Sequence, residues 1–213
     1  MPIKTFYSSD FPPNALRVNH MLKLKGVELD YVDINMMKGE QFAPEYTAVN
    51  PSQTIPAILL EDGTVLSEVV AMLYYLDNEY PQRPLMGRSA LERAQVLGWL
   101  HKIFVTGLMS IAETLRNGLA PGFENRALPG PLNIKQIPEL TERGQQKLAF
   151  FFDTMETELS GKEFLVGNEL TQADVDLYIC TNFSAAIKQK PDPEKHKALV
   201  AHKERISALL EQA

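Results

Sequence analysis

The stretch 50–76 constrains the fold more than any other part of the chain. It contains two short apolar runs on either side of Asp62-Gly63, and this pair is a strong signal for a tight hairpin turn. A helical pattern begins directly after the second run, at Glu68. We therefore expect strand, turn, strand and helix in this order. A helix that opens on an acid offers a place to hold a zwitterionic amino acid.

The first 80 residues combine the periods of strands and helices. Apolar runs predict strands at 3–7, 29–34, 57–60 and 64–66, and apolar residues at helical spacing predict helices at 14–25, 44–49 and 68–80. Gly26 follows the first helix, where a residue of left-handed conformation commonly ends one. The resulting order is strand, helix, strand, helix, strand, strand, helix.

The segment 81–87 holds two prolines and a glycine between two helical patterns, which predicts a domain boundary. We expect a first domain at 1–80 and an all-helical second domain at 88–213. In the second domain, the helical period predicts helices at 89–116 and 139–159. The first of these is expected to turn Leu91, Ala94, Leu97, Leu100, Phe104, Leu108, Ile111 and Leu115 toward the core. Aromatic positions such as Phe150 are also expected to lie mostly in the core.

The segment 117–138 contains four prolines and three glycines. It is too broken for one helix and too long for an ordinary connection, and long loops in compact domains are often functional. Further along, Thr171 is followed three residues later by Asp174, which predicts a capping box at the start of a buried helix. We expect this box to be structural, and Cys180 in the same helix to be a buried thiol.

Composition excludes several classes of function. A net charge of -6 argues against a nucleic-acid partner, which normally meets clustered Lys and Arg. The single cysteine excludes a disulfide framework and fits a reducing compartment. The four histidines are too widely spaced for a metal centre, so we expect no metal. Because the chain has no leader pattern and no 18-residue apolar run, we expect a cytoplasmic protein without a membrane partner.

Two spaced patterns carry a family resemblance. The stretch 50–76 reads NP-x(3)-IPA-x(4)-DG-x(2)-L-x-E-x(2)-A-x(3)-YL, and the capping box follows Phe164-Leu-Val-Gly-Asn. Both resemble glutathione S-transferases, the first their glutathione-binding half and the second their helical domain. The resemblance covers both halves of the chain. It implies an α/β thioredoxin-like N-terminal domain, an all-α C-terminal domain, glutathione as co-substrate and a homodimer.

Glutathione reacts as its thiolate, and a free thiol has a pKa of about 8.5. Lowering that pKa by about two units needs about 2.7 kcal/mol. One hydrogen bond to a charged group supplies about 1.5–3 kcal/mol, and a helix N-terminus adds about 0.3–1 kcal/mol. We therefore look for one donor in the loop 8–14, which leads into the first helix.

The resemblance also indicates which donor to expect. In family members that use a serine, the hydroxyl lies shortly before an arginine that corresponds to Arg17, and Pro13 stands at that place. Pro13-Asn14 before Arg17-Val18 instead resembles nu-like and related bacterial and fungal transferases, in which an Asn amide and a nearby hydroxyl approach the sulfur. Asn14 is the first choice as catalytic donor, and Ser9 the second. The alternative is that Asn14 only caps the helix and Ser9 only closes the loop.

The glutathione contacts follow from the same resemblance. Ile55, before a Pro56 expected in cis, presents its backbone to the cysteinyl residue. Glu68 accepts from the γ-glutamyl ammonium, and the Val69 N–H donates to the carboxylate beside it. Val69 stands where the family usually has Ser, which predicts about 1.5–3 kcal/mol less affinity unless Ser67 or a water compensates. The alternative for Glu68 is a plain acid at a helix start.

Other positions complete the expected site. Gln41 corresponds to the position that reaches the glycyl carboxylate, with Gln53 or Thr54 as neighbours. Phe11, Arg116 and Asn117 are expected in an electrophile pocket between the domains.

These expectations lead to a glutathione transferase whose bound thiolate attacks a small hydrophobic electrophile. Two alternatives stay open. One is another glutathione-dependent reaction, such as peroxide or disulfide reduction or an isomerisation, which the Pro-Asn loop permits. The other is a non-catalytic glutathione-transferase-like binding protein, which the absence of serine at positions 13 and 69 favours.

Overall fold

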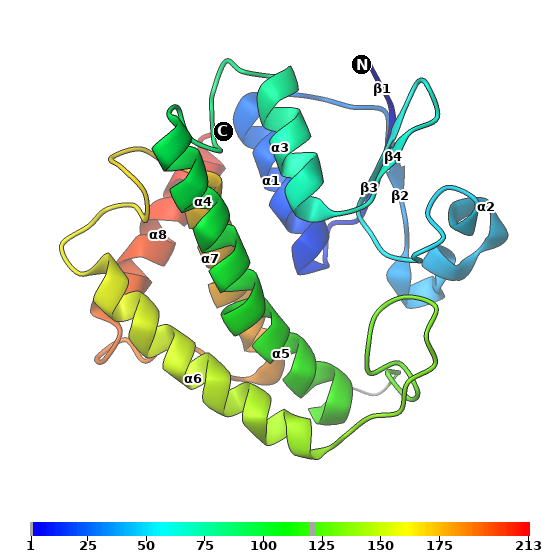
Figure 1. The fold of residues 1–213 in the computed structure, drawn as a ribbon. Helices are drawn as coiled ribbons and strands as arrows, with labels where there is room; N and C mark the ends of the chain where they lie inside the picture. Colours follow the sequence, from blue (N-terminus) through cyan, green and yellow to red (C-terminus); the bar gives the residue numbers. More distant parts are fainter. Residues whose placement is uncertain (1, 120–121) are drawn as a thin grey trace. The chain divides into compact units, whose positions relative to one another are not determined.

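The computed structural model describes residues 2–119 and 122–213 (Figure 1). The predicted order of elements in the first 80 residues is confirmed, and so is the cis peptide bond between Ile55 and Pro56. In chain order these elements are β1 (Ile3–Ser8), α1 (Pro13–Lys25), β2 (Tyr31–Asp33), the 3₁₀ turns η1 (Met36–Lys38) and η2 (Glu40–Phe42), α2 (Pro44–Thr47), β3 (Ala57–Leu60), β4 (Val65–Leu66) and α3 (Val69–Glu79).

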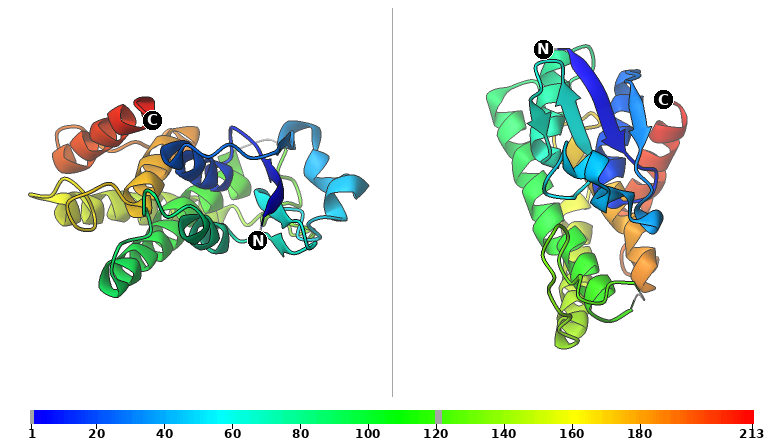
Figure 2. Two further views of the ribbon diagram at one scale, coloured as in Figure 1. Left: turned by 90° about the horizontal axis from the view of Figure 1, so that it is seen from above. Right: turned by 90° about the vertical axis from the view of Figure 1, so that its right-hand side faces the viewer.

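The four strands form one mixed sheet in the order β2-β1-β3-β4, as Figure 2 (right) shows for β1 and its neighbours. β1 runs parallel to β2 and antiparallel to β3, and β4 is antiparallel to β3. This is a thioredoxin-like sheet, as the sequence predicts. The edge strand β2 is shorter than the predicted 29–34, because only its three exposed residues pair with β1.

Each face of the sheet is covered by a different layer. In Figure 1, α1 and α3 lie together on one side of the strands and α2 lies on the other. On the α2 side, Ile34, Tyr46 and Ile55 form a buried cluster against which Tyr7 and Met36 pack. On the helical side the buried residues are Phe6, Val18, Met21, Leu22, Ile58, Met72, Leu73 and Leu76. The sheet therefore has a core on both faces.

Two devices fix the far ends of α1 and α3. Gly26 ends α1 in the left-handed conformation (φ 62°), as predicted. The Lys25 ammonium lies 2.7 Å from the Asp77 carboxylate and also donates to the Tyr80 and Arg83 carbonyls. These contacts hold the C-terminal ends of the two helices together. The N-terminal ends of both helices lie at the opposite end of the sheet.

The rest of the described chain is helical, with one isolated bridge between Arg126 and Ile134. The elements are α4 (Ala90–Lys102), the π-helical η3 (Ile103–Leu108), α5 (Met109–Thr114), the π-helical η4 (Leu115–Leu119), α6 (Glu139–Leu159), α7 (Gln172–Phe183), the 3₁₀ turn η5 (Ser184–Ile187) and α8 (Lys197–Glu211). By internal contacts the chain divides into two compact units, Met1–Pro84 with Pro129–Leu132, and Leu85–Leu128 with Asn133–Ala213.

The predicted helix 89–116 departs from the expectation in two ways. It is interrupted by η3, where the Met109 N–H bonds the Phe104 carbonyl five residues back. Its predicted stripe also mixes two faces, because Leu91 (69% exposed) and Leu97 lie in solvent. Phe150, expected in the core, is 72% exposed. Apolar spacing alone does not distinguish a buried stripe from an exposed apolar one.

The helices of the second unit approach closely where side chains are small. A Cβ on Gly144 of α6 would lie 2.6 Å from the Ser110 carbonyl oxygen of α5. The capping box of α7 is present, with the Thr171 N–H donating to the Asp174 carboxylate at 2.9 Å. Cys180 is buried, as predicted.

Candidate functional site

The register of the sheet gathers the predicted site residues at one end. β1 ends at Ser8 and runs antiparallel to β3, with Tyr7 opposite Ala57. Pro56, the residue before β3, therefore lies beside the end of β1. From that end the chain passes through a short loop to Asn14 in the first turn of α1.

Two further segments reach the same end of the sheet. β4 returns along β3 with Leu66 opposite Ile58, so Glu68 is brought back to the end where β3 begins. β2 is parallel to β1, so the segment that follows it, which contains Gln41, leaves from this end as well. In Figure 1, α1 and α3 both start here. The sheet topology thus brings together residues far apart in the sequence.

The loop between β1 and α1 is held by a side chain of the helix that it precedes. The Ser8 hydroxyl donates to Asn19 Oδ1 at 2.8 Å, and Asn19 Nδ2 donates to the Ser9 carbonyl at 3.0 Å. Ser9, the second-choice catalytic residue, is half-buried in this loop. Asn19 was not predicted to have a role, although an Asn in the helix next to a Ser-rich loop is a weak signal for such a clamp.

Asn14 does not cap α1. The N-cap is Pro12, which makes no side-chain capping bond, and Pro13 stands at the start of the helix. The capping alternative for Asn14 is therefore wrong. Asn14 is half-buried, and its Oδ1 accepts a hydrogen bond from Arg17 Nη1 at 3.3 Å.

The segment before β3 is shaped by Tyr46 and Asn50. The Tyr46 hydroxyl donates to the Thr54 carbonyl at 2.5 Å, and Asn50 Nδ2 donates to the same oxygen at 2.7 Å. Burial raises the pKa of Tyr46 to about 12, so the hydroxyl stays protonated as a donor. Gln53 takes the left-handed conformation (φ 56°) in this turn, and Ile55 is buried.

Neither Tyr46 nor Asn50 was predicted as a site residue. For Asn50 a signal exists, because it begins the quoted pattern and Asn-Pro favours a turn. Its Oδ1 accepts from the Ser52 N–H at 3.2 Å, which is the bond of such a turn. Tyr46 lies outside the pattern and becomes recognisable only when α2 packs on the sheet.

The start of α3 combines an exposed acid with free backbone donors. Glu68 is the N-cap residue, its side chain is exposed, and it makes no capping bond. Val69, the first residue of the helix, is buried. A carboxylate beside the N-terminus of a helix presents negative charge and N–H donors side by side, which suits the ammonium and carboxylate of an α-amino acid.

Gln41 lies in η2 and is only 7% exposed. Among the residues that the structure describes, its Oε1 has no hydrogen-bond partner. Its neighbour Glu40 accepts from the Asn35 N–H at 2.8 Å, which fixes the turn. Gln41 therefore has unused hydrogen-bonding capacity at the end of the sheet that holds Asn14 and Glu68.

The three residues predicted for an electrophile pocket belong to different units. Phe11 lies in the first unit and is 72% exposed. Arg116 and Asn117 lie in the second unit. Asn117 is buried, with Nδ2 donating to the Glu113 carbonyl and Oδ1 accepting from the Ile137 N–H, both at 2.9 Å. Its amide thus ties the 117–138 loop to η4, and the pocket role stays a prediction.

Arg116 also contacts this loop. It donates to the Arg126 carbonyl at 3.0 Å, and its guanidinium lies 4.7 Å from the centre of the Phe123 ring. Burial lowers the pKa of Arg116, and the neighbouring positive charge of Arg126 lowers it further. The cation is therefore held in a partly desolvated place, where an anionic or polarised group would be favoured.

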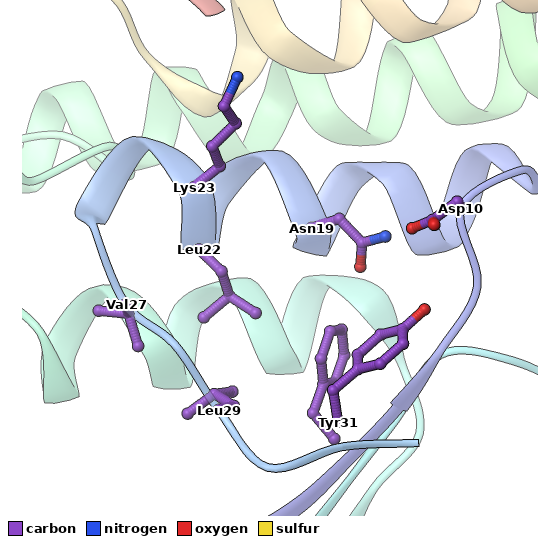
Figure 3. Close-up of a pocket in the computed structure, with 8 residues that line it drawn as sticks. Asp10, Asn19, Leu22, Lys23, Val27, Leu29 and Tyr31 are labelled. Atoms are coloured by element: carbon purple, nitrogen blue, oxygen red, sulfur yellow. The ribbon is translucent and has the colours of Figure 1, made fainter. Parts of the chain in front are cut away.

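A hollow of about 270 Å³ lies on the first unit (Figure 3). It is lined on one side by Leu22, Leu29 and their apolar neighbours, and on the other by Asp10, Asn19 and Tyr31. Burial and the nearby carboxylate of Asp10 raise the pKa of Tyr31 to about 12. None of the predicted glutathione contacts lines this hollow, although Asn19, which clamps the loop at Ser9, does.

Within 2–119 and 122–213, no group of three or more His, Cys, Asp and Glu side chains is arranged to hold a metal ion. In the same part of the chain, no helix has the length and apolar character needed to cross a membrane.

Comparison with known proteins identifies the family. The sequence matches the glutathione S-transferase N-terminal domain over residues 11–79 and the C-terminal domain over residues 119–209. It is 32% identical over 178 residues to glutathione S-transferase F10 of Arabidopsis thaliana, which covers 81% of this chain and 77% of that protein. The chain belongs to the glutathione S-transferase family. Its fold is that of the family, a thioredoxin-like domain with a helical domain.

Other members are similar over different lengths. Glutathione S-transferase Z1 of A. thaliana is 39% identical over 80 residues, which are 38% of this chain and only 36% of that protein. Elongation factor 1-gamma of Schizosaccharomyces pombe is 27% identical over 186 residues, 87% of this chain and 42% of that protein. The crystal structure of Gtt2 from Saccharomyces cerevisiae superposes with a TM-score of 0.85 at 25% identity, and the match covers 98% of this chain and 99% of that one.

Proposed function

We propose that this glutathione S-transferase family member binds glutathione at the end of the sheet and transfers it to a small hydrophobic electrophile. The observation that carries this proposal is the register of the sheet. This register brings Asn14, the Ile55–Pro56 pair and Glu68 to the same end of the sheet, although they come from three separate segments. The proposed glutathione site lies in residues 1–80, and the helical residues 88–213 contribute to the pocket for the electrophile.

The proposed catalytic step is attack by the glutathione thiolate on the electrophile. The carbon–sulfur bond forms with the electron pair of the sulfur, and the thiol proton has left beforehand. The chain must therefore favour the ionised sulfur. Asn14 Nδ2 is the proposed donor to it, with the Ser9 hydroxyl and the N–H groups at the start of α1 as further support. One such bond supplies about 1.5–3 kcal/mol, or one to two pKa units.

The peptide part of glutathione would use the neighbouring groups. Glu68 accepts from the γ-glutamyl ammonium, the Val69 N–H donates to the adjacent carboxylate, and the Ile55 backbone pairs with the cysteinyl residue. Gln41 reaches the glycyl carboxylate with help from Gln53 or Thr54. The Thr54 carbonyl already accepts two hydrogen bonds, so this residue would contribute its hydroxyl or its N–H.

The electrophile would bind against Phe11, Arg116 and Asn117. We also propose a cytoplasmic homodimer. The observation that favours the dimer is the exposure of three apolar side chains of α4 and η3, because Leu91, Leu97 and Val105 are 69%, 38% and 41% exposed. Exposed apolar side chains mark contact surfaces where they gather in one patch.

The test is a calorimetric titration with glutathione. The wild-type protein should bind, and Glu68→Ala should lose binding, because the ammonium would then be desolvated without an acceptor. The control is Glu61→Ala, an exposed glutamate at the opposite end of the β3–β4 hairpin, which should bind like the wild type. Asn14→Ala should still bind glutathione but raise the pKa of the bound thiol. Absence of heat from the folded wild-type protein would refute the proposal.

A second candidate is a binding protein without transferase activity. Two observations favour it: Pro13 and Val69 stand where serine is usual, and the chain is similar over most of its length to elongation factor 1-gamma. A glutathione-affinity matrix separates the classes. Retention with competitive elution supports a glutathione-dependent enzyme, and failure of the folded protein to bind supports the second candidate. Assays with peroxide, disulfide and isomerisable substrates would then distinguish transfer from other glutathione chemistry.

A further inference from the structure

We propose that Arg17 is a positioning residue that orients the Asn14 amide toward the glutathione sulfur. This inference rests on the proposed function and adds a residue to it. Arg17 is in α1, three residues after Asn14 and therefore on the same face of the helix. It is 2% exposed, which is unusual for a residue whose charge is costly to bury.

In the hydrogen bond between the two side chains, Arg17 must be the donor and Asn14 the acceptor. Arg17 Nη1 lies 3.3 Å from Asn14 Oδ1. A guanidinium has five N–H donors and no acceptor, so the amide must turn its oxygen toward it. The two N–H bonds of Nδ2 then point away from Arg17. Without Arg17, the amide of Asn14 could rotate by half a turn and present its oxygen to the sulfur, where it would disfavour the thiolate.

The charge of Arg17 acts in the same direction. A hydrogen bond from a cation polarises the amide, which makes the N–H groups on its other side stronger donors. The guanidinium is a permanent cation in a desolvated place, so its field also favours a nearby anion. Orientation, polarisation and charge together would lower the pKa of the bound thiol while leaving the peptide contacts at Glu68 and Ile55 unchanged.

The first measurement is the pH dependence of thiolate absorbance in the glutathione complex. Arg17→Met keeps a long apolar side chain but removes the donor and the charge. We expect the pH midpoint to rise by about one unit, the lower end of the shift that a nearby opposite charge causes. The rate at a pH below both midpoints should fall about tenfold, because one pKa unit is a tenfold change in thiolate. The affinity for glutathione should change little.

Arg83→Met is the matched control. Arg83 Nη1 donates to the Leu24 carbonyl at the other end of α1, about 15 Å from Asn14 at the helical rise of 1.5 Å per residue. This variant also loses a hydrogen bond to α1 but should keep the wild-type midpoint. Arg17→Lys, which retains a cationic donor, should recover at least half of the shift.

Asn14→Asp decides the case even where Arg17→Met does not fold. The carboxylate keeps an acceptor for Arg17 but has no N–H groups for the sulfur. If Asn14 serves the sulfur, the midpoint rises. An unchanged midpoint would mean that the Asn14 amide does not serve the sulfur, which overturns this inference and the donor role proposed for Asn14 while leaving glutathione binding untouched. It is equally overturned if folded Arg17→Met keeps the wild-type midpoint. A wild-type protein that does not bind glutathione refutes the proposed function instead.

Discussion

At the scale of residues, several polar side chains at the end of the sheet hold other groups in place. Asn19 clamps the loop before α1 with one bond to each of two serines. Tyr46 and Asn50 converge on the Thr54 carbonyl. Such bonds lock a segment before any ligand arrives, which reduces the entropy that binding must overcome. The groups that remain available at this end, Glu68 and Gln41, are then held by a rigid frame.

Val69 offers a direct test of how the carboxylate of the glutamyl residue is held. Val69→Ser places a hydroxyl at the first residue of α3, beside the free N–H groups. We expect the affinity for glutathione to rise at least about tenfold, since a hydrogen bond to a charged group contributes about 1.5–3 kcal/mol. Val69→Ala removes the same apolar contacts without adding a hydroxyl and is the control in the same calorimetric titration. Equal affinities of the two variants would place the carboxylate elsewhere.

The sequence predicts some of these residues and not others, for a physical reason. Pro56 and Glu68 flank a β-hairpin that leads directly into a helix. Residues close in the sequence specify both of these structures. Arg17 is different, because a charged residue is expected to face solvent, whereas the folded chain buries it. Asn19 likewise acquires its partners from the loop folding back on the helix.

At the scale of elements, α4 and α5 illustrate where periodicity succeeds and fails. The helical pattern of 89–116 is correct in type, but the chain inserts the π-helical η3 within it. Hydroxyls of Thr106 and Ser110 bond carbonyls four residues back, as Ser and Thr often do where helices bend. A π-helical turn contains an extra residue, so it changes which side chains share a face before and after it. A single apolar stripe therefore cannot describe both halves of the helix.

The two capping boxes of the second unit provide a matched pair for a stability prediction. Asp174 of α7 is fully buried and accepts hydrogen bonds from the Leu165 N–H, the Thr171 N–H and hydroxyl, and His202. Its counterpart in α4 is Glu92, which accepts from two backbone N–H groups at an exposed helix start. The boxes have the same sequence logic but differ in burial.

We expect Asp174→Ala to lower the free energy of unfolding by at least about 3 kcal/mol, because several buried donors lose this acceptor. Glu92→Ala should cost about 1 kcal/mol, since water replaces the lost acceptor. Urea unfolding of both variants measures the difference. Similar losses would show that burial of the α7 box contributes nothing beyond ordinary capping.

At the scale of the whole molecule, the candidate site is a product of topology. No single motif contains it, because its parts come from the loop after β1, the turn after β2, the start of β3 and the start of α3. The strand order brings them to one edge. The order of elements was predictable from periodicity. This order, together with the parallel and antiparallel pairing of the strands, determines which segments meet at this end of the sheet. The fine positions of side chains were not, because they depend on which face each helix buries.

The exposed face of α4 predicts how the molecule associates. Leu91 and Leu97 of α4 are 69% and 38% exposed, whereas Val96 and Leu100 of the same helix are buried. If this face is the proposed dimer contact, Leu91→Glu combined with Leu97→Glu introduces like charges that meet across the interface. Sedimentation velocity should then change from twice 23.9 kDa for the wild type to 23.9 kDa for the double variant. Phe150→Glu, on the exposed face of α6, is the control and should leave the wild-type mass. A wild type that sediments as a monomer, or a double variant that stays dimeric, would contradict the proposed dimer contact. A melting curve of the double variant is measured as well. A lower mass with an unchanged melting curve means that association is lost and the structure of the protomer is kept.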